Sequence, residues 1–238
     1  MSKKNEGKKF EEDFKNSCEK YFTIKLNDSG GGWSQGEKTS FTPPNPCDFI
    51  LHAPPYIIPL ELKSVIGSGT ISFSPVLYSE DKTTLISAPW IKNKNTTHLM
   101  IKHQQVTNLE KFHNKPLTIS GFLFNFREKE MKTKIHPHEV FFVHIMDFIN
   151  FAEKNEGKKS LKRQEAREIG IEIIGNKKRT RYKYDIEKFY KDIIKFKESK
   201  YPTDIKELQK VQKRIQFNYH DVDDFYNDEN VKDFYKEE

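Results

Sequence analysis

Two apolar segments joined by a proline-rich turn constrain the fold of this chain most. Residues 48–52 (DFILH) and 56–65 (YIIPLELKSV) are rich in β-branched, aromatic and other apolar side chains, which favours strands. Residues 53–55 (APP) leave room only for a tight turn, so the two strands are predicted to pair side by side in one sheet. Pro59 has no backbone N–H, and it therefore predicts a bulge or an unpaired side at that point.

The remaining patterns alternate between helices and strands. Residues 117–126 and 140–145 are apolar enough to be strands covered on both faces. Helical patterns cover residues 7–22, 102–112, 186–197 and 204–215. This order predicts an α/β fold with a mixed central β-sheet flanked by helices. We expect one domain over residues 1–185 and a charged helical C-terminal extension with an acidic, partly disordered tail over residues 186–238.

The residue types between these helices and strands predict loops, a helix cap and a hairpin turn. Residues 29–46 are rich in Gly and Pro and predict a loop, and residues 67–99 show little periodicity and predict a long irregular connection. Asp147 is expected to cap a helix that begins at Phe148. Residues 175–176 (GN) are expected to form the turn of a β-hairpin.

Basic residues are clustered. The sequence has 41 Lys and Arg against 35 Asp and Glu, a formal net charge of +6. Residues 158–183 contain ten basic and three acidic residues, whereas residues 220–238 contain eight acidic and two basic ones. A basic body attracts polyanions, and nucleic acid is the commonest of these in a cytoplasm. A lysine-rich composition without a specific partner is the alternative.

Candidate DNA contacts lie at the predicted hairpin tip and on the first helix. They are Lys177, Lys178, Arg179 and Arg181, together with Lys8 and Lys9. Such side chains suit phosphate contacts that position a nucleic acid without reading its sequence. A solvated surface turn explains the hairpin residues equally well.

Neither membrane insertion nor export is expected. No apolar run approaches the roughly 20 residues needed to span a bilayer, and residues 1–10 lack the apolar region of a signal peptide. Cys18 and Cys47 are too few for a disulfide scaffold or a four-thiolate zinc site. We therefore expect a cytoplasmic protein with reduced thiols and no membrane partner.

The two predicted strands carry charged side chains: Asp48 begins the first, and Glu61 and Lys63 lie on the second. Their spacing suits phosphodiester chemistry. Because side chains alternate along a strand, Glu61 and Lys63 face one side while Leu62 faces the core. The turn would fold Asp48 back beside them, so two carboxylates and one ammonium are predicted to converge. A solvated ion pair between strand neighbours is the alternative interpretation.

These groups suit a hard divalent cation. Mg²⁺ takes oxygen ligands, typically one or two carboxylates together with waters and substrate phosphate. Asp48, Glu61 and the Leu62 backbone carbonyl are predicted to supply such a set for Mg²⁺, with Mn²⁺ as a substitute. A bound metal lowers the pKa of its water and stabilises charge on phosphorus. Lys63 is expected to orient or deprotonate the attacking water, or to contact the phosphate.

The same residues resemble a known nuclease signature. Pro46 and Asp48 match P-x-D, and Glu61 and Lys63 match E-x-K, of the PD-(D/E)XK nuclease superfamily. More narrowly, residues 7–185 resemble RecU-type Holliday junction resolvases of Gram-positive bacteria and their phages, whose gap from aspartate to glutamate is also thirteen residues. Further matches to this family are Gly7, Phe10 and Glu11 in the first helix, Ser72 and Phe73 after the E-x-K strand, and Gln105, Val106 and Leu109 in the next helix.

The resemblance implies a restriction-endonuclease-like core over residues 1–185. It implies that Glu11 joins the metal site, and it adds Glu11 and Gln105 to the candidate catalytic residues Asp48, Glu61 and Lys63. It also implies a homodimer that makes paired incisions across a four-way DNA junction with Mg²⁺, and a two-fold dimer presents the two identical sites that paired cuts require. RecU-type proteins carry a protruding stalk before the catalytic aspartate, whereas this chain has only the short Gly-rich loop there.

Some alternatives stay open at this point. Glu12 competes with Glu11, since both lie in one helical turn, and Gln104 competes with Gln105. The sequence predicts a Mg²⁺-dependent endodeoxyribonuclease that resolves branched DNA in recombination or repair. The rivals are a restriction or nicking enzyme of the same superfamily and a non-catalytic DNA-binding protein.

Overall fold

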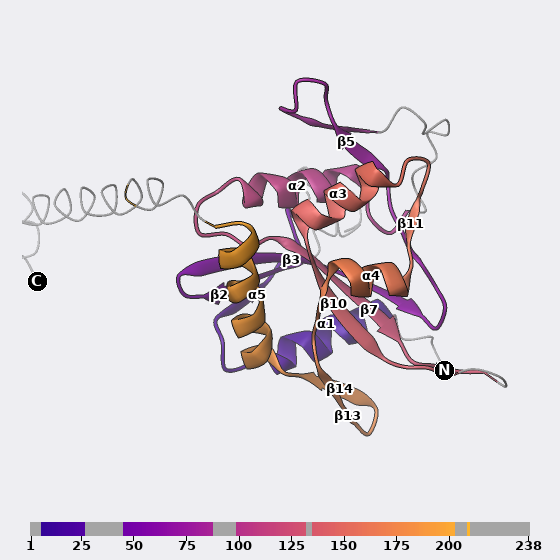
Figure 1. Ribbon diagram of the computed structural model, residues 1–238. Helices are drawn as coiled ribbons and strands as arrows, with labels where there is room; N and C mark the ends of the chain where they lie inside the picture. The colour runs from indigo at the N-terminus through magenta and orange to yellow at the C-terminus, as the bar shows by residue number, and fades with distance from the viewer. Residues whose placement is uncertain (1–5, 27–44, 88–98, 132–134, 203–208, 210–238) are drawn as a thin grey trace, which may run out of the picture.

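A mixed six-stranded sheet forms the centre of the molecule (Figure 1). The computed structural model describes residues 6–26, 45–87, 99–131, 135–202 and 209. The strands lie in the order β1-β2-β3-β7-β10-β12, and β3 and β7 run parallel while the other neighbours are antiparallel. Their bounds are β1 Thr23–Lys25, β2 Phe49–Ala53, β3 Tyr56–Ile66, β7 Gly121–Arg127, β10 Glu139–His144 and β12 Ile171–Glu172. The α/β class and the mixed sheet are confirmed.

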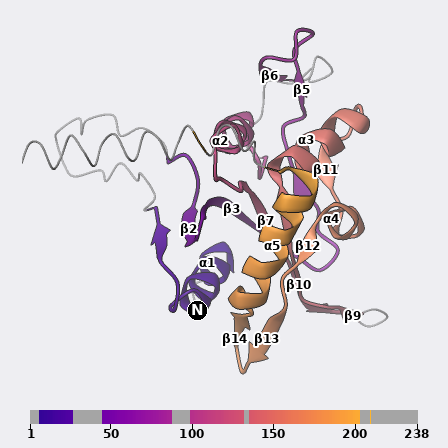
Figure 2. The same cartoon turned by 60° about the vertical axis from the view of Figure 1, so that its left-hand side comes forward.

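Helices cover both faces of this sheet, as Figures 1 and 2 show. One face packs against α1 (Glu6–Ser17) and α5 (Ile186–Lys200), and the other packs against α2 (His103–His113), α3 (Ile145–Lys154) and α4 (Arg163–Ile169). Each helix has an apolar stripe that must be buried, so the sheet acquires two separate cores.

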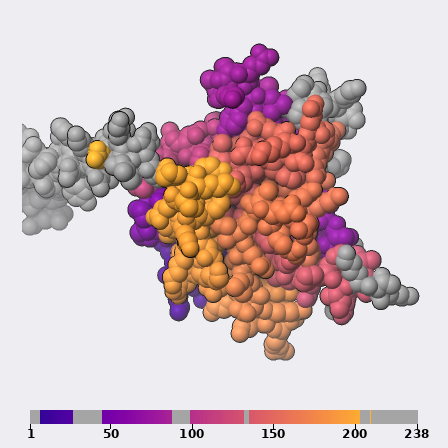
Figure 3. All heavy atoms as spheres, in the orientation of Figure 1, coloured from indigo at the N-terminus to yellow at the C-terminus, as the bar shows by residue number. Residues whose placement is uncertain are grey.

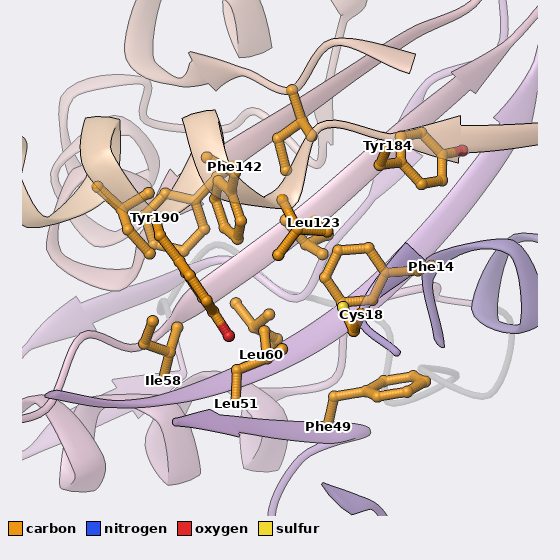
Figure 4. Close-up of a cluster of buried hydrophobic side chains, with 14 of the residues drawn as sticks. Phe14, Cys18, Phe49, Leu51, Ile58, Leu60, Leu123, Phe142, Tyr184 and Tyr190 are labelled. Atoms are coloured by element: carbon orange, nitrogen blue, oxygen red, sulfur yellow. The ribbon is translucent and has the colours of Figure 1, made fainter. Parts of the chain in front are cut away.

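The first core joins α1 and α5 to the sheet. Phe14 of α1 packs edge to face on Phe49 of β2, with ring centroids 5.7 Å apart, and Leu60 and Leu123 lie on the same sheet face (Figure 4). Phe189 of α5 packs in this core as well. The helix at the start of the expected C-terminal extension therefore covers the same sheet as α1.

The second core is rich in phenylalanine. Phe122 and Phe124 of β7 stack on each other at 5.4 Å, and Phe148 of α3 lies 4.8 Å from the ring of Phe122. Residues that alternate with these along β7 belong to the first core, so both faces of the strand are buried. Burial of each such side chain stabilises the fold by roughly 1.5–3 kcal/mol. The predicted helix with Val106 and Leu109 inward is confirmed as α2, where both are buried.

The proline-rich segment folds as its sequence predicts. β2 and β3 pair antiparallel on either side of a two-residue turn, with Ala53 opposite Tyr56. Pro59 pairs with Ile50 of β2, whereas the continuous pairing of β3 with β7 begins only at Leu60. The backbone nitrogen of Pro59, which has no N–H, thus lies where β3 is not paired with β7.

The predicted helix cap at Asp147 is wrong. The helix α3 begins at Ile145, and the Nδ1 atom of His144 accepts a hydrogen bond from the backbone N–H of Met146 at 3.3 Å. Asp147 lies inside the helix and accepts hydrogen bonds from Lys200, at 2.5 Å, and from the Tyr201 hydroxyl, at 2.8 Å. Its carboxylate is therefore engaged by the end of α5, which the local sequence does not reveal.

The predicted turn at residues 175–176 is also wrong. These residues begin β13 (Gly175–Lys178), which pairs with β14 (Arg181–Tyr184), so the turn consists of Arg179 and Thr180. Gly175 lies opposite Tyr184, and a Cβ at Gly175 would approach that ring to 2.9 Å. The glycine allows close packing here and does not supply a turn.

Short strands replace part of the expected irregular connection over residues 67–99. β4 pairs with β11, and β5 pairs with β6 as a hairpin. A further small ribbon, β8 with β9, extends beyond the main sheet (Figure 2). The bounds are β4 Ile71–Ser72, β5 Val76–Tyr78, β6 Leu85–Ser87, β8 Lys129–Glu130, β9 Ile135–His136 and β11 Ser160–Leu161. Two- and three-residue strands carry no periodicity that a sequence pattern can detect.

Several expectations fall largely outside the described residues. These are the Gly-rich loop over residues 29–46, the helix over residues 204–215 and the acidic tail. Within the part of the chain that is described, no helix is both long and apolar enough to cross a bilayer.

We expect the stability of the fold to fall as the pH drops below about 6.5 because of His144. Burial lowers the pKa of this histidine from 6.5 to about 2, so the unfolded chain binds a proton that the folded chain does not. The loss attributable to His144 reaches about 2 kcal/mol by pH 5. Urea unfolding of the wild type and of His144→Asn, which keeps an acceptor for the helix cap, measures it.

The variant should lose less stability than the wild type between pH 7 and pH 5. Substitution of His52→Asn is the matched control, since His52 is exposed on β2, and it should keep the wild-type dependence. Equal pH dependence in the wild type and His144→Asn would contradict the assignment to the buried ring.

Candidate active site

Asp48 is held at the point where β2 begins. Its backbone N–H donates to the Leu60 carbonyl at 3.0 Å, which continues the pairing of Phe49 with Leu60. Its Oδ2 atom accepts a hydrogen bond from the backbone N–H of Leu62 at 2.7 Å. The antiparallel register therefore brings Asp48 onto the edge of β3, beside residues that lie more than twelve positions later in the chain.

Glu61 lies on β3 beside Asp48 and is 3% exposed. Its Oε1 atom accepts from the Lys63 ammonium at 2.6 Å and from the Gln105 amide Nε2 of α2. The amide of Gln105 is oriented in turn, because its Oε1 accepts from the backbone N–H of Lys102 at 3.0 Å. Strand alternation and the first turn of α2 thus place an acid, an ammonium and an amide in one group.

The two carboxyls perturb each other. Burial raises the pKa of Glu61 to about 7, and repulsion from Asp48 adds to this while Lys63 opposes it. Burial likewise raises the pKa of Asp48, against the opposing hydrogen bond from Leu62 and the charge of Lys63. Negative charge in this group is therefore costly, and a cation beside the carboxyls would relieve the cost.

The donor atoms fit Mg²⁺. Asp48 and Glu61 supply carboxylate oxygens, and the Leu62 carbonyl projects from the same strand edge as its N–H. The described residues contain no cluster of three or more His, Cys, Asp and Glu side chains arranged to hold a metal ion. The protein would thus contribute two carboxylates and one carbonyl, which is a common share of the ligands of Mg²⁺.

Glu11 of α1 is the closer of the two candidate glutamates. Its charge contributes to the raised pKa of Asp48, and its Oε2 atom is paired with Lys25 of β1 at 2.8 Å. Glu12 instead points to the β13–β14 hairpin, where it pairs with Arg181 at 2.7 Å. Lys25 was not identified from the sequence, because only the folded chain places β1 beside α1.

The two glutamines differ in the same way. Gln105 contacts Glu61, whereas Gln104 is exposed on α2. Of the predicted catalytic set, the structure therefore groups Asp48, Glu61 and Lys63 with Gln105, and it places Glu11 next to Asp48 with a lysine partner of its own.

The predicted DNA-contact residues differ in their exposure and in their contacts within the protein. Lys178 and Arg179 are exposed at the end of the β13–β14 hairpin, which projects at the lower edge in Figure 3, and Lys8 is exposed on α1. Lys177 pairs with Glu128. Arg181 forms ion pairs with Asp13 and Glu12 of α1. Lys9 lines a pocket beside the hairpin.

The chain is similar to a phage-derived bacterial protein. It is 31% identical over 216 residues to the SPbeta prophage-derived uncharacterized protein YotM of Bacillus subtilis (strain 168), and the aligned region covers 84% of this chain and 92% of that protein. No protein-family model matches the chain.

We expect Mg²⁺ to stabilise the wild-type protein against thermal unfolding at pH 8, which is above the pKa of about 7 of Glu61. A ligand that binds only the folded state adds on the order of 2–3 kcal/mol at a hundredfold excess over its Kd. Asp48→Asn and Glu61→Gln should remove most of this increase. Thermal unfolding in Mg²⁺ and in EDTA measures it, and Glu172→Gln, at an exposed site on β12, should respond like the wild type. Equal stabilisation of all four proteins would exclude this metal site.

Proposed function

The chain belongs to the same family as the SPbeta prophage-derived protein YotM, and we propose that it is a Mg²⁺-dependent endodeoxyribonuclease with a restriction-endonuclease-like core. One observation carries the proposal: Asp48 and Glu61 meet at a strand edge, with Lys63 2.6 Å from the glutamate. The spacing of these residues along the chain also resembles the PD-(D/E)XK signature.

The metal supplies the electrophilic part of the chemistry. When bound, Mg²⁺ makes its water more acidic and offsets negative charge on the phosphate. The chain's own groups have separate tasks. Asp48 is held by the Leu62 N–H in one orientation, and Glu61 is held from two sides, so their oxygens are presented without a large conformational search.

Lys63 is the residue that would handle the attacking water or the phosphate. Its side chain is 15% exposed, and its ammonium lies against a carboxylate. If Glu61 held a cation, its negative charge would be shared, and the Lys63 ammonium could donate a hydrogen bond to a phosphate oxygen or to a water. Gln105 acts as a positioning residue, since it touches Glu61 and the backbone of α2.

The carboxyl pair also controls DNA binding in this proposal. Without a metal, the ionised carboxylates of the half-buried Asp48 and the buried Glu61 would repel a phosphodiester that approaches them. With Mg²⁺ bound, the oxygens of Asp48 and Glu61 would instead hold a positive charge, which attracts the phosphodiester. Binding and cleavage are therefore expected to respond differently to neutralisation of one carboxyl.

Branched DNA is the substrate we propose. The resemblance to RecU-type resolvases supports a four-way junction, and paired incisions require two identical sites, which a homodimer provides. The exposed lysines and arginine at the hairpin end and on α1 suit contacts to phosphates on either side of the cut. These contacts would position the junction without reading its sequence.

We expect Glu61→Gln and Asp48→Asn to reduce cleavage of a synthetic four-way junction by roughly 10²–10³-fold or more. Binding of the junction in EDTA should be equal or tighter, because each change removes a negative charge that faces DNA. Single-turnover cleavage with Mg²⁺ and gel-shift titration measure the two quantities. Glu172→Gln is the matched control and should cleave like the wild type.

Cleavage retained in both carboxyl variants would exclude the site. Absence of cleavage in the wild type, with junction binding intact, would favour the non-catalytic DNA-binding protein.

Junction shape should decide which DNA is cut. We expect the wild type with Mg²⁺ to cleave a four-way junction faster than its linear duplex arms at equal concentration, because positioning by phosphates reads the geometry of the branch. The experiment compares initial rates on the junction, on the arms and on a junction of scrambled sequence. Equal rates on linear DNA, or cutting at one short sequence in every context, would favour a restriction or nicking enzyme.

A further inference from the structure

A pocket of about 410 Å³ lies on the sheet face opposite Glu61 and Lys63. Asn125 of β7 pairs with Ser64 of β3, which alternates with those two residues, and both contribute to the face covered by α1. The pocket is formed by α1, by the ends of β3 and β7 and by the β13–β14 hairpin, which packs against α1 (Figure 2). The carboxyl ends of parallel strands are common ligand sites in α/β sheets.

Two buried polar atoms of this pocket have no hydrogen-bond partner within the described chain. Asn125 is 3% exposed, and its Oδ1 atom is unpaired. The Nδ1 atom of His138 is likewise buried and unpaired, while its Nε2 lies 3.3 Å from the Tyr184 hydroxyl. Buried polar groups are almost always paired in native proteins, so these atoms point to a partner that occupies the pocket.

The wall of the pocket is aromatic. The ring of Tyr182 stacks on His138 with centroids 3.6 Å apart and planes 18° apart, and Tyr184 continues the stack at 6.5 Å. Burial lowers the pKa of His138 to about 4, so the imidazole is neutral at pH 7. A flat, neutral ring surface of this kind suits the π-face of a nucleobase.

The rim of the pocket is positively charged. Lys9, Arg127, Lys177 and Arg179 line it together with two acids, Asp13 and Glu128. Both acids are already neutralised by cations, Asp13 by Arg181 and Glu128 by Lys177. The exposed guanidinium of Arg179, at the turn of the hairpin, therefore adds to a field that favours a phosphate group.

We propose that this pocket binds one nucleotide. The base lies against the Tyr182–His138 pair, its edge donates to the Asn125 Oδ1 atom, and its phosphate contacts the basic rim near Arg179. The nucleotide is either an unpaired residue of a DNA strand or a free nucleoside monophosphate, which share this chemistry. The site goes beyond the proposed cleavage reaction, because it contains neither Asp48 nor Glu61.

Isothermal titration of the full chain in EDTA, with each deoxynucleoside monophosphate and with inorganic phosphate, tests the proposal. We expect the nucleotides to bind at least about tenfold tighter than phosphate, since a base adds stacking and a hydrogen bond. Asn125→Leu, which keeps the branching of the side chain but lacks its amide, and Arg179→Asn, which tolerates the left-handed backbone at this turn, should each weaken nucleotide binding about tenfold or more. Lys183→Gln, exposed on the same hairpin but outside the pocket, is the matched control.

A competition experiment separates the two sources of the nucleotide. A duplex with one unpaired 2-aminopurine should displace dAMP if the ligand belongs to a DNA strand, and a fully paired duplex should not. Binding of dAMP without such displacement identifies a free nucleotide. Absence of nucleotide binding, affinity no better than that for phosphate, or unchanged affinity in folded Asn125→Leu and Arg179→Asn would overturn the proposal. Because no metal or cleavage is involved, failure here is distinct from failure of the nuclease assignment.

Discussion

The antiparallel pairing of β2 with β3 is the constraint on which the candidate site depends. Its register places Phe49 opposite Leu60, so Asp48 reaches the edge of β3 and accepts the Leu62 N–H at 2.7 Å. A slip by one residue would turn Glu61 and Lys63 into the first core and expose Leu62. The apolar residues of β2 and β3 therefore maintain the geometry of the acids, because a one-residue slip would place Glu61 and Lys63 in the apolar core and remove Leu62 from it.

Burial raises the pKa values of the two acids. Glu61 is almost inaccessible, and its pKa of about 7 reflects that burial more than any single neighbour. Lys63 and Gln105 compensate only in part, since one supplies a charge and the other a dipole. The fold thus maintains two acids that favour either a proton or a cation, which distinguishes them from the solvated ion pairs that dominate the surface of α5.

The sequence could predict the parts of this arrangement that depend on neighbours within a few positions. Alternation in β3 and the proline-rich turn were sufficient for the pairing of β2 and β3, and helical spacing was sufficient for Val106 and Leu109. The predictions fail where an element distant in the sequence determines the local structure. Asp147 has the residue type of a helix cap, but its carboxylate accepts a hydrogen bond from Tyr201, which follows α5. Gly175 has the residue type of a turn, but it lies opposite Tyr184 in a strand pair. Lys25 as partner of Glu11 has no local signal at all.

The polar residue in β7 has a different explanation from those in β3. Asn125 interrupts the apolar run of β7 (GFLFNF), and a central strand normally excludes an unpaired amide because its burial is costly. The interruption occurs on the face where α1 and the β13–β14 hairpin leave a pocket, next to the stacked rings of Tyr182 and His138. On the opposite face, the Phe122 and Phe124 side chains beside Glu61 and Lys63 are fully buried. The parallel β3–β7 pair therefore carries Glu61 and Lys63 on one face and the amide of Asn125 on the other.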